Sequence, residues 1–258
     1  MRFDGRVAAV TGGTSGVGEA IARALAAEGV AGLTIAGRDA GRGERIAAEL
    51  SSKGCPTRFL QVDLYRAEDA RSVVLRTVEW FGRIDALANC AASTERSTLD
   101  ETTPELFDRM MAVNVRAPLL TMQEAVRDMR RRGEPGAILN IVSVAALGGQ
   151  PHLTAYAASK GALATLTRNV AHAHRFDRIR VNGILLGWTD TPHEDEIQRR
   201  AHGAGDGWLA AAEAAQPMGR LAKPDELADL AVLMLSERGG IMTGSLVEYA
   251  QDVAGCTD

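Results

Sequence analysis

The chain has 258 residues, of which 46% are hydrophobic, and its formal net charge is −4. This length allows one large domain or two small ones, with enough apolar residues for a sizeable core. The mildly acidic balance excludes the basic footprint of a nucleic-acid-binding protein. No run of about 18 uncharged apolar residues predicts a membrane span, and no apolar segment near the amino terminus predicts a signal peptide.

Cysteines and histidines show no pattern of disulfides or metal ligands. Cys55, Cys90 and Cys256 are scattered and odd in number, which is typical of reduced thiols in a cytoplasmic protein. The five histidines form no HExxH-type cluster, so we expect no catalytic metal.

Short apolar runs alternate with longer amphipathic segments along the chain. Strands are predicted at 7–10, 33–36, 59–62, 84–88, 137–142, 179–182 and 245–249. Helices are predicted at 17–28, 40–50, 68–81, 103–131, 153–174 and 224–235. Nearly continuous apolar strands that alternate with helices are typical of a parallel sheet covered on both faces. No low-complexity linker divides the chain, so we expect a single α/β domain over 1–258, a Rossmann-like doubly wound sheet of about seven strands.

The segment 190–216 breaks this alternation. It is polar and contains Gly203, Gly205 and Gly207. We expect a mobile flap or a short helical insertion over a binding site.

A glycine-rich turn, Thr11-Gly12-Gly13-Thr14-Ser15-Gly16-Val17-Gly18, follows the first predicted strand and opens the first predicted helix. Glycines in this position let backbone N–H groups at a helix start approach a phosphate closely. The spacing G-x-x-x-G-x-G is one residue wider than the usual beginning of a dinucleotide fingerprint. A flexible surface turn is the alternative interpretation.

The residues after the second and third strands bear on the choice of dinucleotide. Gly37 stands where an acidic residue would bind a ribose 2′-hydroxyl, and the following Arg38 suits a 2′-phosphate. We therefore expect NADP, with NAD as the alternative. Asp39 is either a helix N-cap or a charge that repels the phosphate. After the third strand, Asp63 and Leu64 could reach the adenine, although Asp63 could equally be an N-cap.

Tyr156 and Lys160 are four positions apart and share one face of a predicted helix. An ammonium at about 4 Å in an effective dielectric of about 20 is worth roughly 4 kcal/mol, or about three pKa units before desolvation is subtracted. This pairing predicts a Tyr156 pKa low enough for general acid–base chemistry. The alternative is a solvated helix face.

Taken together, these motifs resemble the short-chain dehydrogenase/reductase family over almost the whole chain. The matching residues are Thr11-Gly12-x-x-x-Gly16-x-Gly18, Asp63, Asn89, Asn114, Ser143, Tyr156-x-x-x-Lys160, Gly187 and Thr191. Their order and spacing agree with the family pattern, and the combination is far more specific than any single part.

The resemblance implies an NAD(P)-dependent oxidoreductase that interconverts an alcohol and a ketone or aldehyde. Tyr156 would exchange a proton with the substrate oxygen, and Ser143 would hydrogen-bond that oxygen. Lys160 would lower the Tyr156 pKa and hold the nicotinamide ribose, and Asn114 would keep a water in a proton relay. Cofactor contacts are implied for Thr11, Gly12, Thr14, Ser15, Gly16, Val17, Gly18, Arg38, Asp63, Leu64, Asn89, Ala91, Tyr156, Lys160, Gly187, Thr189 and Thr191.

Three segments depart from the family pattern. Asn89-Cys90-Ala91-Ala92 replaces Asn-Asn-Ala-Gly, and Leu186-Gly187 replaces Pro-Gly. Near the end of the chain, Glu248-Tyr249-Ala250-Gln251-Asp252 replaces the common Asp-Gly-Gly. The first change removes no catalytic group, the second alters the loop that would meet the nicotinamide and pyrophosphate, and the third has no assigned mechanism.

The substrate should meet side chains after the fourth strand, after Ser143 and in the flap. The expected contacts are Thr94, Ala145, Gln150 and Trp188, with Ser93, Glu95, His152 and His193 nearby. This rather polar set favours a polyol, sugar or hydroxy acid over a 3-oxoacyl or steroid-type carbonyl compound. A catalytically silent NADP-binding sensor or scaffold is the alternative to an enzyme, and the intact set of catalytic residues favours the enzyme. The resemblance also implies a dimer or tetramer, joined through helices 103–131 and 153–174.

Overall fold

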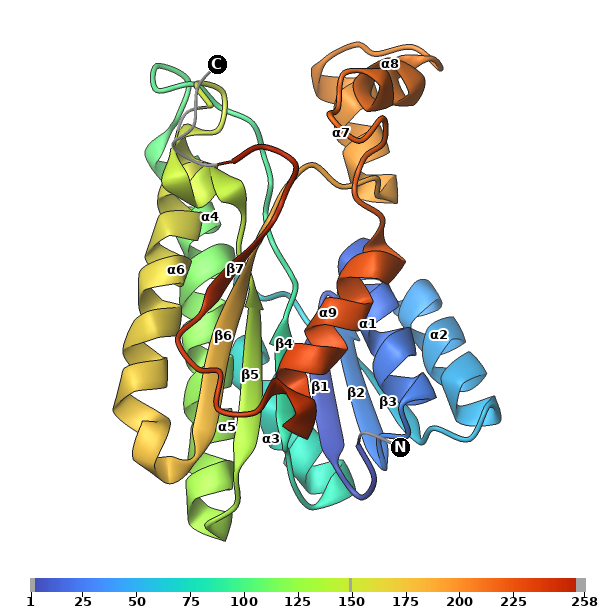
Figure 1. The fold of residues 1–258 in the computed structure, drawn as a ribbon, viewed down its shortest axis with the longest axis vertical. Helices are drawn as coiled ribbons and strands as arrows, with labels where there is room; N and C mark the ends of the chain where they lie inside the picture. The colour runs from blue at the N-terminus through green and yellow to red at the C-terminus, as the bar shows by residue number, and fades with distance from the viewer. Residues whose placement is uncertain (1–2, 149, 254–258) are drawn as a thin grey trace.

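The computed structural model describes residues 3–148 and 150–253, so Cys256 lies outside the described residues. Seven strands form one parallel sheet in the order β3-β2-β1-β4-β5-β6-β7 (Figure 1). Their bounds are β1 (Val7–Thr11), β2 (Gly32–Gly37), β3 (Thr57–Gln61), β4 (Ala86–Asn89), β5 (Gly136–Ile141), β6 (Ile179–Leu186) and β7 (Leu246–Tyr249). The predicted doubly wound sheet is confirmed.

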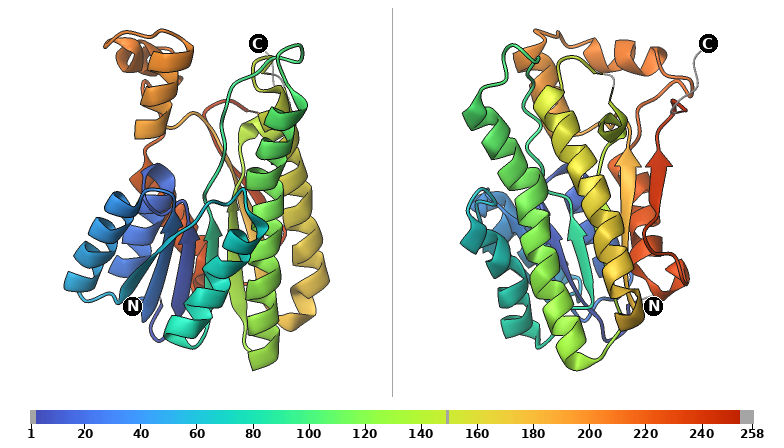
Figure 2. Two further views of the ribbon diagram at one scale, coloured as in Figure 1. Left: turned by 180° about the vertical axis from the view of Figure 1, so that it is seen from behind. Right: turned by 90° about the vertical axis from the view of Figure 1, so that its left-hand side faces the viewer.

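Helices cover both faces of the sheet because successive strand residues point to opposite sides. Ala8 and Val10 of β1 pack in one core with α1 (Gly16–Ala27), α2 (Ala40–Ser52) and α9 (Pro224–Leu235). Ala9 packs in the other core with α3 (Ala67–Phe81), α5 (Ala117–Arg132) and α6 (Thr154–His174). Figure 2 shows this second layer in teal, green and yellow. Burial of both faces explains the nearly continuous apolar strands of the sequence.

The predicted helix 103–131 is interrupted. The structure has α4 (Pro104–Met111), a π-helical turn η1 (Ala112–Arg116) and then α5. Pro118 lacks an N–H group and cannot donate to the Asn114 carbonyl in the α-helical pattern, and the Ala117 N–H reaches back to the Ala112 carbonyl instead. The interruption places the Asn114 side chain inside the protein, where it is 1% exposed.

The predicted flap contains two helices, α7 (Pro192–Ala201) and α8 (Trp208–Ala214), which stand above the carboxyl ends of the strands (Figure 1). The Trp188 and Trp208 rings stack with centroids 6.4 Å apart, and the Trp208 indole N–H donates to Asp195 at 2.7 Å. The helical form of the insertion is therefore confirmed, and its mobility stays a prediction.

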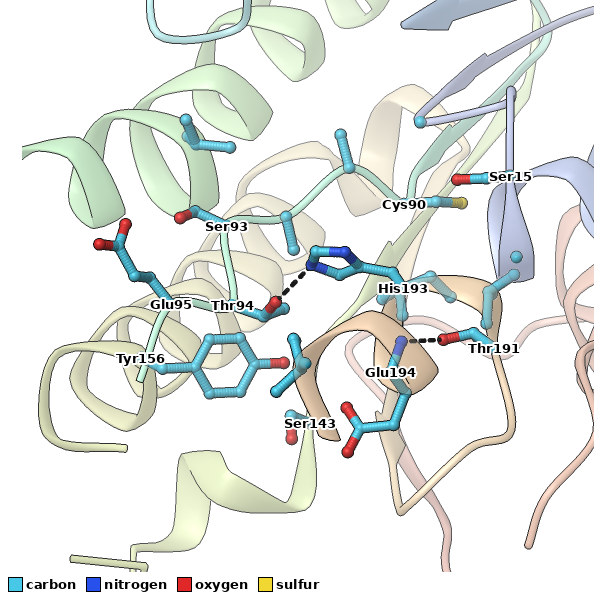
Figure 3. A pocket seen from close by; sticks show the side chains of 18 of the residues that line it. Ser15, Cys90, Ser93, Thr94, Glu95, Ser143, Tyr156, Thr191, His193 and Glu194 are labelled. Carbon is cyan, nitrogen blue, oxygen red and sulfur yellow. Dashed lines mark hydrogen bonds between the residues drawn. The ribbon is translucent and has the colours of Figure 1, made fainter. Parts of the chain in front are cut away.

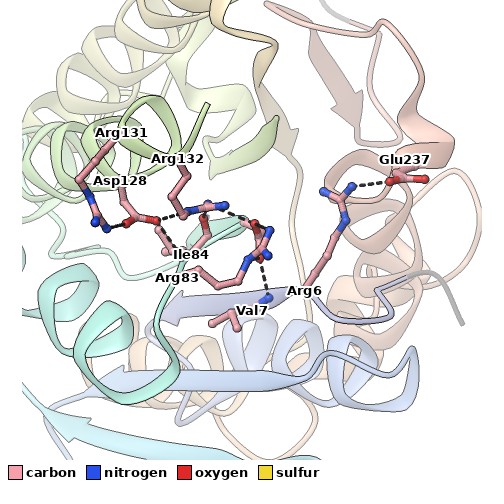
Figure 4. Close-up of polar contacts among 9 residues, drawn as sticks. Arg6, Val7, Arg83, Ile84, Asp128, Arg131, Arg132 and Glu237 are labelled. Atoms are coloured by element: carbon pink, nitrogen blue, oxygen red, sulfur yellow. Dashed lines mark hydrogen bonds and ion pairs between the residues drawn. The ribbon is translucent and has the colours of Figure 1, made fainter. Parts of the chain in front are cut away.

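At the amino ends of the strands, a network of charged side chains joins β1, β4 and α5 (Figure 4). The Asp85 carboxylate accepts a hydrogen bond from the Val7 N–H at 2.9 Å and two from the Arg83 guanidinium, each at 2.7 Å. Arg132 near the end of α5 approaches the same carboxylate at 3.2 Å and also pairs with Asp128 at 2.8 Å. These contacts tie the amino ends of β1 and β4 to α5.

No helix in the described part of the chain is both long and apolar enough to cross a membrane. Within residues 3–148 and 150–253 there is also no cluster of three His, Cys, Asp or Glu side chains arranged to hold a metal ion.

Candidate active site

A large cleft opens above the carboxyl ends of β1 and β4. The chain runs outward from β1 to β3 and then returns to place β4 on the other side of β1, so the loops after β1 and β4 diverge. Ligands of open α/β sheets bind at such a switch point. The cleft has a volume of about 1780 Å³ and is also lined by the loops after β5 and β6 and by α7. Small-ligand pockets usually measure about 300–1,000 Å³, so this cleft has room for a dinucleotide and a substrate together.

The glycine-rich turn lies against the loop after β4. Gly12 has a φ of +69°, and a Cβ atom built there would be 2.9 Å from the Ala91 backbone nitrogen. A Cβ atom at Gly18 would be 2.2 Å from the Gly12 carbonyl oxygen, so no side chain fits at either position. The Ser15 side chain makes no capping hydrogen bond to α1. The bare turn and the uncapped helix start together fit the pyrophosphate of a dinucleotide.

The cofactor residues predicted along the turn line the cleft, namely Gly12, Thr14, Ser15, Gly16, Val17 and Gly18. Thr11 and Asn89 do not share this surface. The Thr11 hydroxyl accepts hydrogen bonds from the Cys90 and Ala91 N–H groups at 3.1 and 3.3 Å. The Asn89 amide is 3% exposed, donates to Asn140 at 2.9 Å and accepts from Thr121 at 2.8 Å. The side chains of Thr11 and Asn89 thus hold the loop after β4 in place and do not face the cleft.

The region predicted to bind the adenosine end has an unpaired cation. Arg38 is exposed, lines the cleft, and its guanidinium has no hydrogen-bond or ion-pair partner among the described residues. Asp39 caps α2 by accepting from the Arg42 N–H at 2.9 Å, and it also pairs with the Arg42 side chain at 2.7 Å. These contacts, led by the backbone hydrogen bond from Arg42, lower the pKa of Asp39. The N-cap interpretation of Asp39 is confirmed, and its charge is paired within the protein.

Asp63 and Leu64 line the cleft beside this region, as does Ala91. The Asp63 carboxylate accepts from the Tyr65 N–H at 3.1 Å and forms a local turn. Arg66 occupies the N-cap position of α3. The alternative that Asp63 is an N-cap is therefore wrong.

Asn114 joins the loop after β4 to α6. Its side-chain oxygen accepts from the Ser93 N–H at 2.8 Å, and its amide donates to the Ser93 carbonyl and to the Ser159 hydroxyl, both at 2.9 Å. The Ser159 hydroxyl donates in turn to the Tyr156 carbonyl at 2.7 Å. Asn114 thereby fixes the loop that carries the expected substrate contacts relative to the helix that carries Tyr156. The predicted water relay stays a prediction.

The Tyr156 hydroxyl faces the Ser143 side chain inside the cleft (Figure 3). Burial raises the pKa of the Tyr156 phenol above its ordinary value, and the Ser143 hydroxyl opposes this shift in part. Ser143 itself is 9% exposed and caps the short helix η2 (Val144–Leu147) by accepting from the Ala145 N–H at 3.1 Å. The cap holds the Ser143 side chain in one orientation.

Lys160 lies one helical turn beyond Tyr156 and also lines the cleft. Its ammonium donates to the Ile141 carbonyl at 2.7 Å and lies 5.6 Å from the centroid of the Tyr156 ring. Burial lowers the pKa of Lys160 to about 8. The ammonium is directed at the Ile141 carbonyl and burial dominates at the phenol, so the lowering of the Tyr156 pKa by Lys160 stays a prediction.

The loop after β6 carries the other predicted cofactor residues. A Cβ atom at Gly187 would be 2.9 Å from the Ala250 Cβ, and the Gly187 N–H donates to the Tyr249 carbonyl at 2.9 Å. Thr189 is 7% exposed, and Thr191 caps α7 by accepting from the Glu194 N–H at 3.1 Å. The Thr191 side chain also lies 3.4 Å from where a Gly16 Cβ would stand, next to the glycine-rich turn.

The unusual segment near the end of the chain supports this loop and the return from the flap. The Gln251 side chain accepts from the Met218 N–H at 2.8 Å and donates to the Arg220 carbonyl at 2.6 Å. We assign a packing role to this departure from the family pattern.

The residues predicted to contact the substrate, Thr94, Ala145, Gln150 and Trp188, all line the cleft. The Thr94 hydroxyl lies 2.9 Å from the His193 Nε2 atom, and the Trp188 indole N–H donates to Glu194 at 2.9 Å (Figure 3 labels Thr94, His193 and Glu194). These contacts connect the loop after β4 and the loop after β6 to α7.

Sequence reasoning missed Arg96 and Glu194, which pair at 3.3 Å across the cleft. Arg96 follows Glu95 directly, so a slightly longer window after the fourth strand would have included it. Thr191-x-x-Glu194 has the residue pattern of a helical capping box, which places Glu194 in the first turn of α7. The prediction of a flap or short helical insertion over 190–216 did not assign a start to its helix, so this signal was not used.

The chain resembles known proteins over nearly all of its length. A family profile described as enoyl-(acyl carrier protein) reductase matches residues 12–249. A short-chain dehydrogenase from Aspergillus ruber is 34% identical over 255 residues, which are 92% of each chain. The cis-4-hydroxycyclohexanecarboxylate dehydrogenase of Sinomonas cyclohexanicum is 30% identical over 246 residues, or 95% of each chain. A solved 3-oxoacyl (acyl-carrier-protein) reductase from Agrobacterium tumefaciens with NADP bound is 27% identical, with a TM-score of 0.87 over 97% of this chain and 95% of that one.

Proposed function

This chain belongs to the short-chain dehydrogenase/reductase family of oxidoreductases acting on CH–OH groups, and we propose that its substrate is polar and its preferred cofactor NADP. The polar substrate would be a polyol, a sugar or a hydroxy acid. The observation that carries the proposal is the Tyr156 hydroxyl facing Ser143 in one cleft with Lys160 and the glycine-rich turn.

The proposed chemistry needs one proton transfer and good positioning from the protein. A bound nicotinamide dinucleotide supplies or accepts the hydride. In ketone reduction, Tyr156 donates its proton to the substrate oxygen, and its raised pKa keeps the phenol protonated before the reaction. In alcohol oxidation, the Tyr156 phenolate accepts the hydroxyl proton. Ser143 donates a hydrogen bond to the substrate oxygen and aligns it with Tyr156.

The preference for NADP rests on Arg38. Its guanidinium is unpaired among the described residues, and Gly37 leaves no acidic side chain beside it. Asp39 does not oppose a 2′-phosphate strongly, because Arg42 pairs with it. The NADP-bound relative from Agrobacterium tumefaciens is consistent with this choice.

The proposal is tested by measuring NADPH and NADH oxidation with a panel of sugars, oxo acids, 3-oxoacyl thioesters and steroid ketones. We expect turnover of polar ketones, with NADPH preferred. In Arg38→Asp the preference should move toward NADH by about tenfold or more, because the carboxylate repels a 2′-phosphate and accepts from a 2′-hydroxyl. Arg45→Asp on α2 is the matched control for the added negative charge.

Three results would count against parts of the proposal. A clear preference for steroids or acyl thioesters would remove the polar substrate. Unchanged selectivity in Arg38→Asp would remove Arg38 from the cofactor site. NADPH binding without turnover on the whole panel would favour the alternative of a catalytically silent sensor.

A further inference from the structure

We propose that the substrate carries an anionic group, a carboxylate or a sulfonate, and that Arg96 binds it. The inference rests on the proposed function and narrows the polar substrate to an anionic hydroxy or oxo compound. Arg96 would bind the anionic group in the same cleft that contains Tyr156.

Arg96 is close to the reacting groups. It lies on the loop after β4, lines the cleft, and its side chain is 20% exposed. The positive charge of Arg96 lowers the pKa of the Tyr156 phenol in part, and the negative charge of Glu194 raises it. Arg96, Tyr156 and Ser143 line one cleft, so a substrate whose oxygen lies between Tyr156 and Ser143 shares that cavity with the Arg96 guanidinium.

The guanidinium of Arg96 is incompletely paired. One terminal nitrogen approaches the two Glu194 oxygens at 3.3 and 3.5 Å, longer than the roughly 2.7–2.9 Å of good charge-assisted hydrogen bonds. The Nε atom is buried and has no acceptor. A partly desolvated cation with weak partners gains free energy from a further acceptor, and a carboxylate or sulfonate matches the guanidinium fork.

Glu194 does not depend on Arg96 for its hydrogen bonds. Its Oε1 atom accepts from the Trp188 indole at 2.9 Å and from the Gln198 amide at 2.8 Å. When an anion binds Arg96, the Glu194 Oε1 atom keeps these two neutral donors, and the guanidinium is shared between the anion and the Glu194 carboxylate. This arrangement distinguishes Arg96 from a cation that only completes a salt bridge.

The surroundings of Arg96 also suit an anion. The rings of His152 and His202 lie 5.9 Å apart and both line the cleft. Arg96 lines the same cleft, and burial, followed by the charges of Arg96 and His202, lowers the pKa of His152, so its ring is a neutral hydrogen-bonding group at pH 7. Two neighbouring carboxylates have partners of their own, which reduces their repulsion of an anion. Glu95 pairs with Arg109 at 3.9 Å, and Glu194 accepts hydrogen bonds from Trp188 and Gln198.

The test compares ketones that differ only in charge, using NADPH and the full chain. Two pairs serve, 4-oxocyclohexanecarboxylate with its methyl ester and acetoacetate with its methyl ester. We expect the acid of at least one pair to have a kcat/KM about tenfold or more above its ester. In Arg96→Met this advantage should disappear, mainly through KM, while kcat/KM for the ester changes less than about threefold.

Two further variants control for structural effects. Arg96→Lys retains the charge and should recover part of the advantage. Arg76→Met removes an exposed cation from α3, away from the residues that line the cleft, and should leave the acid-to-ester ratio unchanged. A melting temperature within a few degrees of the parent shows that each variant is folded.

A binding measurement separates this inference from the proposed function. Cyclohexanecarboxylate and cyclohexanecarboxamide cannot be reduced as ketones, and their Kd values are measured by calorimetry with NADP present. We expect the carboxylate to bind about tenfold more tightly, and only with Arg96 intact. Equal binding of the two, or an unchanged Kd in Arg96→Met, overturns the anion site. Absence of turnover on the whole ketone panel would instead contradict the proposed function.

Discussion

Lys160 shows how a functional side chain can reduce stability. It is 2% exposed, its ammonium donates to the Ile141 carbonyl, and burial lowers its pKa to about 8. Keeping this ammonium charged in the folded chain costs free energy, because its pKa in the unfolded chain is near 10.5. Below pH 8 both the folded and the unfolded chain bind the proton, and the cost is fully present. Between pH 8 and pH 10.5 only the unfolded chain still binds it, so the folded chain gains stability as the pH rises.

We therefore expect Lys160→Met to lose oxidoreductase activity and yet be as stable as the parent at pH 7, or more stable by up to roughly 3 kcal/mol. The difference should shrink in favour of the parent between pH 8 and pH 10. Urea unfolding of both chains across this range measures it. Lys53→Met removes an exposed lysine and controls for the loss of one charge. A difference that is large and destabilising at pH 7, or independent of pH, would contradict this account of Lys160.

The roles of Tyr156, Lys160 and Ser143 could be proposed from the sequence because these residues occur at the spacing of the family motif. The partner of Lys160 could not, since the Ile141 carbonyl becomes available only when β5 and α6 pack together. The Arg96–Glu194 pair joins positions about a hundred residues apart, and pairings across such distances leave no local pattern.

At the scale of helices and strands, α4, η1 and α5 show where periodicity is insufficient. The amphipathic pattern continues through 103–131, so it predicts one helix. The π-helical turn arises from Pro118 and from the burial of Asn114, whose amide is bonded to Ser93 and Ser159. A proline within a helical run was the available signal.

The amino ends of the strands allow a test of stability apart from function. Asp85 has a fully buried side chain that binds Arg83, Arg132 and the Val7 N–H, at the edge opposite the cleft. Replacing Asp85 with Asn removes the carboxylate that pairs with Arg83 and leaves Arg132 with Asp128 as its counter-charge, and we expect a loss of about 3 kcal/mol in the free energy of unfolding. The kcat should stay within about twofold of the parent, because the cleft is at the other edge.

Glu237→Gln is the matched control for that variant. Glu237 pairs with Arg6 on the surface, where its side chain is 76% exposed (Figure 4). Surface pairs contribute little, so we expect a change below about 1 kcal/mol. Denaturant unfolding of both variants and steady-state kinetics decide the comparison, and equal stability losses would contradict the role given to Asp85.

At the scale of the whole molecule, the strand order follows from local patterns combined with general rules of topology. Both the apolar strands and the turn after β1 could be read directly, and together they place the cleft above β1 and β4. The packing of α7 and α8 over the cleft could not be predicted in detail, because it depends on contacts such as Trp188 with Trp208. Association through the predicted helices 103–131 and 153–174 remains a prediction. A partly apolar groove lined by Leu119, Met122, Val126 and Val170 lies between α5 and α6.

The role of Tyr156 as the acid and base is tested most directly by Tyr156→Phe, which removes one hydroxyl and keeps the ring. Steady-state kinetics on the best ketone, together with the Kd for NADPH by fluorescence, form the measurement. We predict a kcat about 10²–10⁴-fold lower with an unchanged Kd for NADPH, since the hydroxyl moves the proton and the ring only packs. A variant that binds NADPH normally and keeps a near-parental kcat would contradict the account.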